Sequence, residues 1–383
     1  MFKYFLKKIS RNNVFLIKPF KKTNILQNPV IFGYTKITDL NAYRFIYIGK
    51  LYKQKLQLKK ILTRIEKNKI KLQHLHYKIL IKEIKFIYKK IDFLKNVYDF
   101  EANKIDPNYK VTFPELNYDY YNKKFFGLTK KDISKNIEIV PIEKSELFIY
   151  KSKLIELLEF TVAHVEGFKY KFGTFVLMSH SAGILNIPNK KSYSLREIIT
   201  LFFHEMTHFF RRYNNLRNYG TSYGFLDYMK IDEGFSLYNE YYYGKKLMKG
   251  LKYNPYYEAC FEVLLNIKLT EEEKKEKIYE ILKIKGFDKD KSLYYYYRFH
   301  RYSAFGSNQF FLKDLIYTKG YKSVKKLLKT DPLYYDIIFS GKIGMSFIKK
   351  QIYDCSNNYD VKSYFDDILL EIKDKFNIKN IKK

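Results

Sequence analysis

Residues 194–240 read SLREIITLFFHEMTHFFRRYNNLRNYGTSYGFLDYMKIDEGFSLYNE, and this stretch contains two closely spaced histidines followed by several carboxylates. It opens with Ser194 and Glu197 in the S-x-x-E spacing of a capping box, which predicts the start of a helix. Neither Gly nor Pro interrupts the segment before Asn214. Apolar residues recur in it at helical spacing, namely Ile198, Leu201, Phe202, Met206 and Phe209. The sequence therefore predicts an amphipathic helix that presents one side to a core.

The predicted helix contains two histidines one turn apart, His204 and His208, in the pattern H-E-x-x-H. At this spacing both imidazoles point to the same side of a helix and can bind one Zn²⁺ ion through ring nitrogens. Zinc held by two histidines and one carboxylate keeps a position open for water. Glu205, between the histidines, can take a proton from that water during attack on an amide. We therefore predict one Zn²⁺ per chain, with Glu205 as the general base.

The third ligand is expected from one of the carboxylates that follow, Asp232, Glu233 or Glu240. Spacing alone does not rank these three. We select Glu233, because it lies at the expected start of a second helix whose apolar spacing would pack it against the first. Asp232 is then expected as a helix cap or as a partner of a metal ligand, and Glu240, two turns further on, as a group that orients an imidazole.

The alternative is a structural helix with two hydrogen-bonded histidines. The chain has seven histidines, so the H-E-x-x-H pattern can also arise by chance. Here a capped amphipathic helix carries the pattern and carboxylates follow it, which favours a metal site. The two cysteines, Cys260 and Cys355, lack C-x-x-C spacing, which argues against a thiolate zinc site or a disulfide framework. A reducing, cytoplasmic location fits this cysteine usage best.

The segment HEMTHFFRRYNN, followed by DEGFS, resembles the catalytic segment of the microtubule-associated tyrosine carboxypeptidases and of their bacterial relatives named for a QEGLA motif. Those proteins typically read H-E-x-x-x-H-x-x-R-x-x-N-N and then E-E-G-L-A. The resemblance implies that His204, His208 and Glu233 are metal ligands and that Glu205 is the general base. This chain has one residue fewer between its histidines, so we expect an ordinary α-helix there.

Further segments extend this resemblance over about residues 28–330, densely in the middle and thinly at both ends. The matching segments are Asn28–Pro29 with Phe32 and Tyr34, Gly183–Pro188, Arg298 with Arg301, and Phe311–Gly320. Arg211, Asn214 and Asn215 match the tail of the family's histidine motif. The resemblance implies a zincin-like metallopeptidase that removes a C-terminal aromatic residue, such as tyrosine, from a protein or peptide. An endopeptidase or an aminopeptidase is the alternative enzyme.

Two arginines on a tyrosine-rich helix, Arg298 and Arg301, need anionic partners if they are buried. In an enzyme that cuts at the end of a chain, they can hold the terminal carboxylate of the substrate and fix which bond reaches the metal. Lys313 is a further candidate for this clamp. An internal salt bridge, for instance to Asp314, is the alternative and is equally supported by the sequence.

Three other residues receive expected roles around the metal. A tetrahedral oxyanion needs one more hydrogen-bond donor, for which Tyr317 is the first candidate and Arg211 the second. Arg211 is therefore expected to face the substrate. Asn215 is expected to support the metal-binding residues from behind.

The chain is expected to be mostly helical α+β, with a small sheet beside the metal-binding helix. Two strands are predicted at Phe175–Met178 and Gly183–Ile187. Helices are predicted at residues 145–164, 255–267, 270–285 and 288–301. We divide the chain into a basic extension (1–27), a helical N-terminal region with long amphipathic helices between Lys50 and Tyr98 (28–140), a catalytic core (141–330) and a helical C-terminal region packed on it (331–383).

The composition gives a net charge of +32, mainly from lysine, in a chain of 383 residues without Trp. The codon usage of an AT-rich genome accounts for such a composition, and the alternative is attraction to an acidic partner such as an acidic peptide tail. No clustered Arg and aromatic residues indicate specific nucleic-acid binding. No run of about 18 apolar residues indicates a membrane span. A basic polyanion-binding protein with a structural metal remains the alternative from another functional class.

Overall fold

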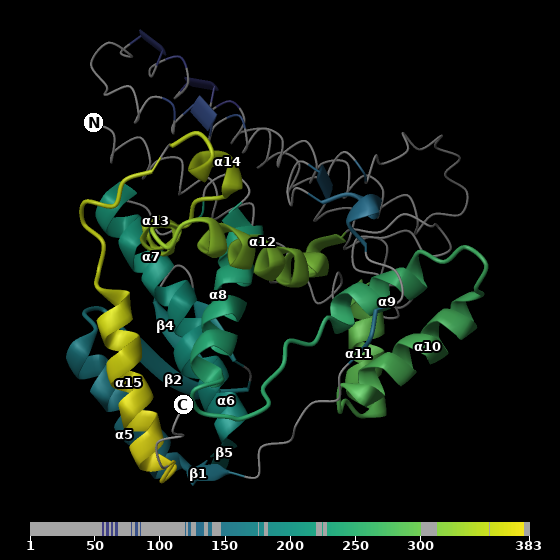
Figure 1. Ribbon diagram of the computed structural model, residues 1–383, viewed down its shortest axis with the longest axis horizontal. Helices are drawn as coiled ribbons and strands as arrows, with labels where there is room; N and C mark the ends of the chain where they lie inside the picture. Colours follow the sequence, from purple (N-terminus) through teal and green to yellow (C-terminus); the bar gives the residue numbers. More distant parts are fainter. Residues whose placement is uncertain are drawn as a thin grey trace. The chain divides into compact units, whose positions relative to one another are not determined.

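The computed structural model describes residues 128–133, 137–139, 147–174, 176–179, 183–219, 224, 228–299, 312–351 and 353–378, with isolated positions between residues 56 and 123 (Figure 1). The predicted extension 1–27 and most of the helices predicted between Lys50 and Tyr98 lie outside the described residues. The same is true of Arg301. Among the described residues, none of the helices is both long and apolar enough to cross a bilayer.

The chain divides into two compact units. One consists of Met1–Asn136, Glu258–Lys283 and Phe287–Asp314. The other consists of Ile137–Tyr257, Ile284–Gly286 and Leu315–Lys383, and it contains the predicted metal-binding segment. This division differs from the continuous core predicted for residues 141–330, because most of residues 258–314 belong to the first unit. The C-terminal residues 331–383 share the second unit with the metal-binding segment.

Two small sheets lie in the second unit. Strands β2 (Lys169–Gly173), β4 (Ile184–Pro188) and β3 (Leu177–Ser179) form a three-stranded sheet in that order, with β2 parallel and β3 antiparallel to β4. Strands β1 (Phe148–Tyr150) and β5 (Ser192–Ser194) form an antiparallel pair. The predicted pair of strands is confirmed as β3 and β4, and the mostly helical α+β class is confirmed as well. The sequence analysis missed β2, whose sequence KYKFG lacks an apolar run.

The predicted helix at 145–164 begins later than expected. Residues Phe148–Tyr150 form β1 instead, and α5 covers Lys151–His164. Alternation explains the strand, since Ile149 is buried between the exposed Phe148 and Tyr150.

The segment with the two histidines is a continuous run of three helical pieces. Ser194 caps the first, α6 (Leu195–Ile199), because its side chain accepts the N–H of Glu197 and the Glu197 carboxylate accepts the N–H of Ser194, as the capping box predicted. A π-helical segment, Thr200–Glu205, follows and leads into α7 (Met206–Tyr219). The expectation of an ordinary α-helix is therefore wrong for the turn that ends at Glu205. Such wide turns are rare and often occur at functional sites.

The next helix, α8 (Tyr228–Gly244), begins five residues before Glu233, so the expectation that Glu233 starts this helix is wrong. It packs closely against α12 (Ile316–Thr330), as Figure 1 shows. The backbones meet at Gly234 and Gly320, where an added Cβ on either glycine would lie 2.1 Å from an atom of the other helix. Only glycine allows this approach, which holds α12 directly behind the segment that carries Glu233.

The remaining C-terminal helices are α13 (Tyr334–Phe339), α14 (Met345–Ile348) and α15 (Val361–Lys375). Helix α15 lies beside α5 (Figure 1), and the hydroxyls of Thr161 and Tyr364 share a buried hydrogen bond of 2.9 Å between them. Edge-on ring pairs, including Phe210 against Tyr364 and Phe203 against Phe365, continue this core to the helical run that carries the two histidines.

Helices α9 (Tyr256–Leu264), α10 (Glu271–Ile284) and α11 (Lys289–Phe299) match the predicted ones within a few residues. Asn254 caps α9 as predicted, because its Oδ1 accepts the N–H of Tyr256 at 3.1 Å. Within the first unit, Phe261 and Phe299 pack edge to face, with ring centroids 5.4 Å apart. A short 3₁₀ helix, Leu312–Leu315, precedes α12.

Candidate metal centre

Three side chains from two helices converge in the second unit. His204 is the second-to-last residue of the π-helical segment, His208 lies in the first turn of α7, and Glu233 lies in α8. Glu233 Oε2 is 3.7 Å from His204 Nε2 and 3.4 Å from His208 Nε2, and the donor atoms of all three groups lie within 4.8 Å of one another. Two ligands of one tetrahedral zinc ion are expected roughly 3.4 Å apart. The three residues predicted as ligands therefore have the separations that one ion needs.

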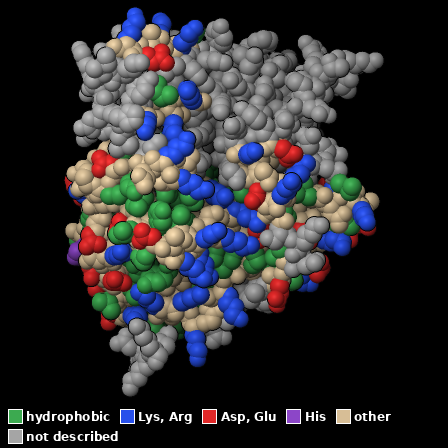
Figure 2. Space-filling view, turned by 45° about the horizontal axis from the view of Figure 1, so that its top comes forward, with side chains coloured by type: hydrophobic (Ala, Val, Ile, Leu, Met, Phe, Trp, Pro, Cys, Tyr) green, Lys and Arg blue, Asp and Glu red, His purple; other side chains and the backbone are tan. Residues whose placement is uncertain are grey.

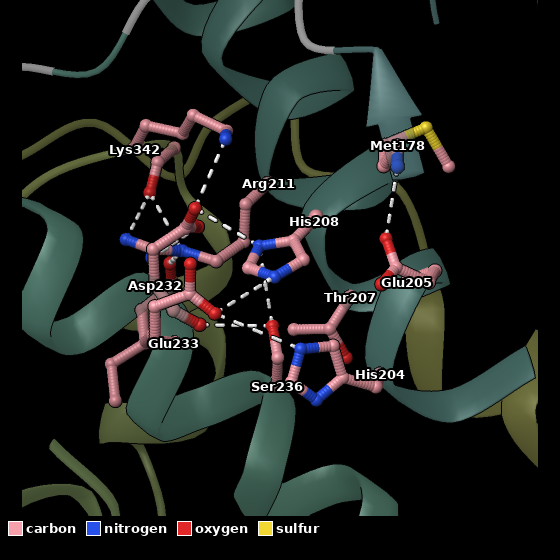
Figure 3. Close-up of polar contacts among 12 residues, drawn as sticks. Met178, His204, Glu205, Thr207, His208, Arg211, Asp232, Glu233, Ser236 and Lys342 are labelled. Carbon is pink, nitrogen blue, oxygen red and sulfur yellow. Dashed lines mark hydrogen bonds and ion pairs between the residues drawn. The ribbon is translucent and has the colours of Figure 1, made fainter. Parts of the chain in front are cut away.

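Each histidine is held from behind by a carboxylate. His204 Nδ1 lies 2.9 Å from Glu240 Oε2. His208 Nδ1 lies 3.0 Å from Asp232 Oδ2 (Figure 3). A carboxylate on Nδ1 makes that nitrogen the protonated one and leaves the lone pair of Nε2 for a metal. Both Nε2 atoms face Glu233. The sequence analysis expected these roles of Asp232 and Glu240, and the contacts with the imidazoles are present.

The two supporting carboxylates are themselves held by cations. Arg196 of α6 pairs with Glu240. Asp232 pairs with two cations, Arg211 at 2.7 Å from Oδ1 and Lys342 at 3.0 Å from Oδ2. All of these carboxylates and cations except Arg196 are at least nine-tenths buried. The sequence analysis did not assign a role to Arg196 or Lys342.

Burial and charge act in opposite directions on the two imidazoles. Burial by itself lowers the pKa of His204, but its contacts with Glu233 and Glu240 outweigh burial and raise that pKa well above its usual value. Burial also lowers the pKa of His208, but the carboxylates of Asp232 and Glu233 outweigh burial and raise this pKa to about 9. A cation is therefore strongly favoured at this position, either as protons on the imidazoles or as a metal that replaces them.

The carboxyl groups respond in the opposite sense. Burial raises their pKa values, but adjacent cations outweigh it, so that the pKa of Asp232 lies well below its usual value and that of Glu240 falls to about 2. The pKa of Glu233 is lowered too, mainly by His208 and His204 acting against burial. All three groups are thus ionised at neutral pH, the state that metal binding needs.

Glu205 takes a different direction from the histidines beside it. Its carboxylate points to β3, where Oε2 accepts the backbone N–H of Met178 at 3.0 Å (Figure 3). The strand is at the edge of its sheet. The contact fixes the rotamer of a carboxylate that is next to His204 in the chain. Glu205 is therefore not one of the three groups that converge on one point.

The donor set fits zinc. Two neutral imidazole nitrogens and one carboxylate oxygen are the ligands of a common type of catalytic zinc site, in which a fourth position holds water or substrate. The hydrogen-bonded carboxylates behind both histidines are typical of such sites. His204, His208 and Glu233 would hold the ion.

The predicted substrate-facing role of Arg211 is wrong. Its side chain is fully buried and every guanidinium nitrogen donates inside the protein. The acceptors are Asp232 and the carbonyl oxygens of Ile338, Gly341 and Ile343. No nitrogen of Arg211 faces solvent, so it holds a carboxylate and a loop in place.

Asn215 acts on the same loop. Its Oδ1 accepts the N–H of Lys342 at 2.9 Å, so it supports the predicted metal ligands through Lys342 and Asp232. Asn214 holds backbone on either side of this loop, since its Nδ2 donates to the carbonyl oxygen of Phe339 and its Oδ1 accepts the N–H of Tyr359. The tail of the histidine motif therefore binds the C-terminal part of the chain.

The other expected substrate contacts are Tyr317, Lys313 and Arg298, and of these only the side chain of Tyr317 is described. Tyr317, in the first turn of α12, is half-buried and stacks on Tyr257 with ring centroids 5.2 Å apart. Lys313 lies in the 3₁₀ helix and Arg298 in α11, both in the first unit, and their side chains are not described. The proposed carboxylate clamp thus stays a prediction.

Comparison with protein-family models, with curated proteins and with solved structures finds no match to this chain.

Proposed function

We propose that the protein is a zinc-dependent metallopeptidase with a zincin-like core, and that His204, His208 and Glu233 bind its metal. The observation that carries this proposal is the convergence of two Nε2 atoms and one carboxylate oxygen within 4.8 Å, each imidazole having a carboxylate on its other nitrogen. A purely structural helix has no need for two such pairs aimed at one point.

Glu205 is the general base of this proposal. A bound zinc ion acidifies water and polarises a carbonyl group. Glu205 accepts the proton of the attacking water and passes it to the leaving amine nitrogen. The hydrogen bond from Met178 fixes the orientation of the carboxylate that performs both transfers. A structural metal site would not require a glutamate at this position.

The carboxypeptidase type and the release of a C-terminal aromatic residue rest on the motif resemblance. A protein or peptide with a free C-terminus is then the substrate, with Arg298, Arg301 and Lys313 as candidates to bind its carboxylate. Tyr317 is the candidate donor to the oxyanion. An endopeptidase or an aminopeptidase would use the same metal centre without this clamp.

The test uses one aromatic-ended peptide in two forms, with a free and with an amidated C-terminus, and mass spectrometry of the products. A carboxypeptidase removes the last residue from the free form only, whereas an endopeptidase cuts both forms. Glu205→Gln should bind zinc like the wild type and lose about 10²–10⁴-fold in turnover. Full turnover in Glu205→Gln, or a wild type that takes up no zinc, would refute the proposal.

A second candidate function is the binding of a polyanion, with the metal in a structural role. One observation favours it. Residues 241–257 and 315–330 contain nine lysines and no Asp or Glu, whereas α10 and α15 mix acids with their lysines. Tyr253 stacks on Tyr321 with centroids 4.4 Å apart and so joins these two segments. Figure 2 shows Lys and Arg side chains gathered on the described part of one face.

Salt dependence separates this candidate from the peptidase. Polyanion binding should weaken steeply with salt, and Lys325→Glu together with Lys326→Glu, on the exposed side of α12, should reduce it. Glu205→Gln should leave it unchanged. Binding that ignores both salt and the charge reversal would remove this second candidate.

A further inference from the structure

The two carboxylate and histidine pairs of the metal centre differ in one respect. Among the described residues, Arg196 forms an ion pair with the carboxylate behind His204, while Arg211 and Lys342 both form ion pairs with the carboxylate behind His208. Lys342 and His208 share the same oxygen of Asp232, each at 3.0 Å (Figure 3). The second cation therefore acts on the very atom that accepts the hydrogen bond of a metal ligand.

The position of Lys342 is built by the fold. It lies in the loop Ser340–Gly344, all five residues of which are buried. A buried loop needs partners for its backbone groups, and α7 provides them through Arg211, Asn215 and Asn218. Gly341 lets the loop approach α7, since a Cβ there would lie 2.5 Å from Asn215 Oδ1. The backbone of this loop is therefore fixed, and it places the side chain of Lys342 against Asp232.

Pairing alone does not account for Lys342. Arg211 already neutralises Asp232, and it holds the same loop by three hydrogen bonds to the carbonyl oxygens of Gly341 and Ile343 and the end of α13 by one to Ile338. Lys342 is 1% exposed, and burying a second cation against one carboxylate carries a desolvation cost. A hydrophobic residue at this position would avoid that cost. The extra charge therefore calls for another explanation.

A charge count around the site gives one. Asp232, Glu233 and Glu240 are ionised, and Glu205 is a fourth carboxylate that acts on His204, while Arg196, Arg211 and Lys342 pair with Glu240 and Asp232. Lys342 thus cancels one of the negative charges that would otherwise face the position between the imidazoles. A divalent ion would then be less compensated by its surroundings than it would be without Lys342, which would make it a stronger Lewis acid but a more weakly bound one.

We infer that Lys342 is a positioning residue that acts through Asp232 and sets the balance between metal affinity and metal acidity. By withdrawing charge from Asp232, it makes His208 a weaker electron donor to a metal, and its own charge repels the ion. This inference rests on the proposed function, because tuning the acidity of a metal is useful only where the metal takes part in hydrolysis. Lys342 itself lies outside the histidine motif.

A purely structural role predicts the opposite effect on metal binding. If Lys342 served only to hold the loop, its loss would loosen Asp232 and weaken zinc binding. If it tempers the site electrostatically, its loss tightens zinc binding. The sign of the change in affinity therefore separates the two roles without a measurement of activity.

The experiment measures Zn²⁺ affinity of the full chain by competition with a chelator for wild type, Lys342→Met, Lys342→Arg and Lys349→Met. Methionine keeps the length of the side chain, and Asp232 retains Arg211 and His208 as partners, so this variant should fold. We expect Lys342→Met to bind zinc about tenfold more tightly, within the usual range for changes behind a metal-binding histidine. Lys342→Arg keeps the charge, and Lys349 is an exposed lysine of the same region, so both should match the wild type.

Zinc binding by Lys342→Met that equals or falls below wild-type affinity overturns the inference. Should that variant fail to fold, Lys342→Gln gives the same comparison. A wild type that binds zinc, a variant that binds it more tightly and no peptide cleavage by either would refute the proposed function but keep this inference. A wild type that binds no zinc would refute both.

Discussion

Two parts of the helical run from Leu195 to Tyr219 make different contacts. In the front end, residues 204–208, His204 and His208 point at Glu233, and Glu205 points at a strand edge. In the rear end, residues 211–218, Arg211 and the asparagines hold loop backbone from the C-terminal part of the chain. One uninterrupted motif, H-E-x-x-H-x-x-R-x-x-N-N, therefore supplies two of the proposed metal ligands from its first half and holds the C-terminal part of the chain with its second half.

Residues within one motif therefore need not touch the same ligand. The rear end does affect the front, because Arg211 and the loop that carries Lys342 meet at Asp232, which holds His208. If the division is right, changes at the front alter metal binding with little loss of stability. Changes at the rear should destabilise the fold first.

The largest effect is expected at the junction of the two ends. Arg211→Met removes a buried ion pair and leaves carbonyl oxygens of the loop unpaired, so unfolding in urea should become easier by about 3–5 kcal/mol. Arg217→Met is the matched control, since Arg217 is an exposed arginine of the same helix and its loss should change stability by no more than about 0.5 kcal/mol. Equal stability of the two variants would contradict the structural role of Arg211.

A smaller, purely local effect is expected at the front. Glu240→Gln weakens the hold on His204 Nδ1, so Zn²⁺ affinity measured against a chelator should fall about 10–100-fold. Asp374→Asn removes an exposed carboxylate of α15 and serves as the control for charge. Unchanged zinc affinity in Glu240→Gln would show that His204 is not a ligand or does not need this partner.

The front end was largely predictable from the sequence, because its signals are local. The capping box at Ser194, the histidine spacing and the carboxylates near Glu233 are all read along one helix or the next. Strands β3 and β4 followed from short apolar runs. The π-helical turn was not predictable in this way, since the H-E-x-x-H spacing is satisfied by an ordinary α-helix and tertiary packing decides the winding.

The rear end could not be predicted for a different reason. Arg211 has the same local signal whether it faces a substrate or a buried loop more than 120 residues further along the chain. Lys342 is one of 72 Lys and Arg residues, and its neighbours carry no motif. Contacts between distant segments determine both roles, and a single sequence does not reveal them.

The pH dependence of zinc binding sharpens the view of the front end. Since the pKa of His208 is raised to about 9, a proton occupies this imidazole below that pH and must leave before a metal binds. Zinc affinity should therefore rise by about tenfold per pH unit between pH 7 and pH 9, or more steeply where His204 also loses a proton. The carboxyl pKa values are lowered, so these groups add no slope in that range.

Competition with a chelator at several pH values checks this slope, once the pH dependence of the chelator itself is subtracted. The metal-free protein gives an independent check. Because the folded pKa of His208 lies above its unfolded value, its contribution to stability is complete below about pH 6.5 and is lost as the pH rises to about 9. A zinc affinity that is flat from pH 7 to pH 9 would contradict the charged state of this imidazole.

The smallest effect is expected for a single asparagine at the rear. Asn214→Ala removes two hydrogen bonds, to the carbonyl oxygen of Phe339 and from the N–H of Tyr359, and should cost about 1–3 kcal/mol of unfolding free energy. Because Asn214 is not bonded to Asp232 or to Lys342, the zinc affinity of Asn214→Ala should stay within about twofold of wild type. Asn215→Ala removes the acceptor of the Lys342 N–H and should lower both stability and zinc affinity. A loss of zinc binding in Asn214→Ala at full stability would mean that this end of the motif belongs to the site after all, and the division drawn between the two ends would fail.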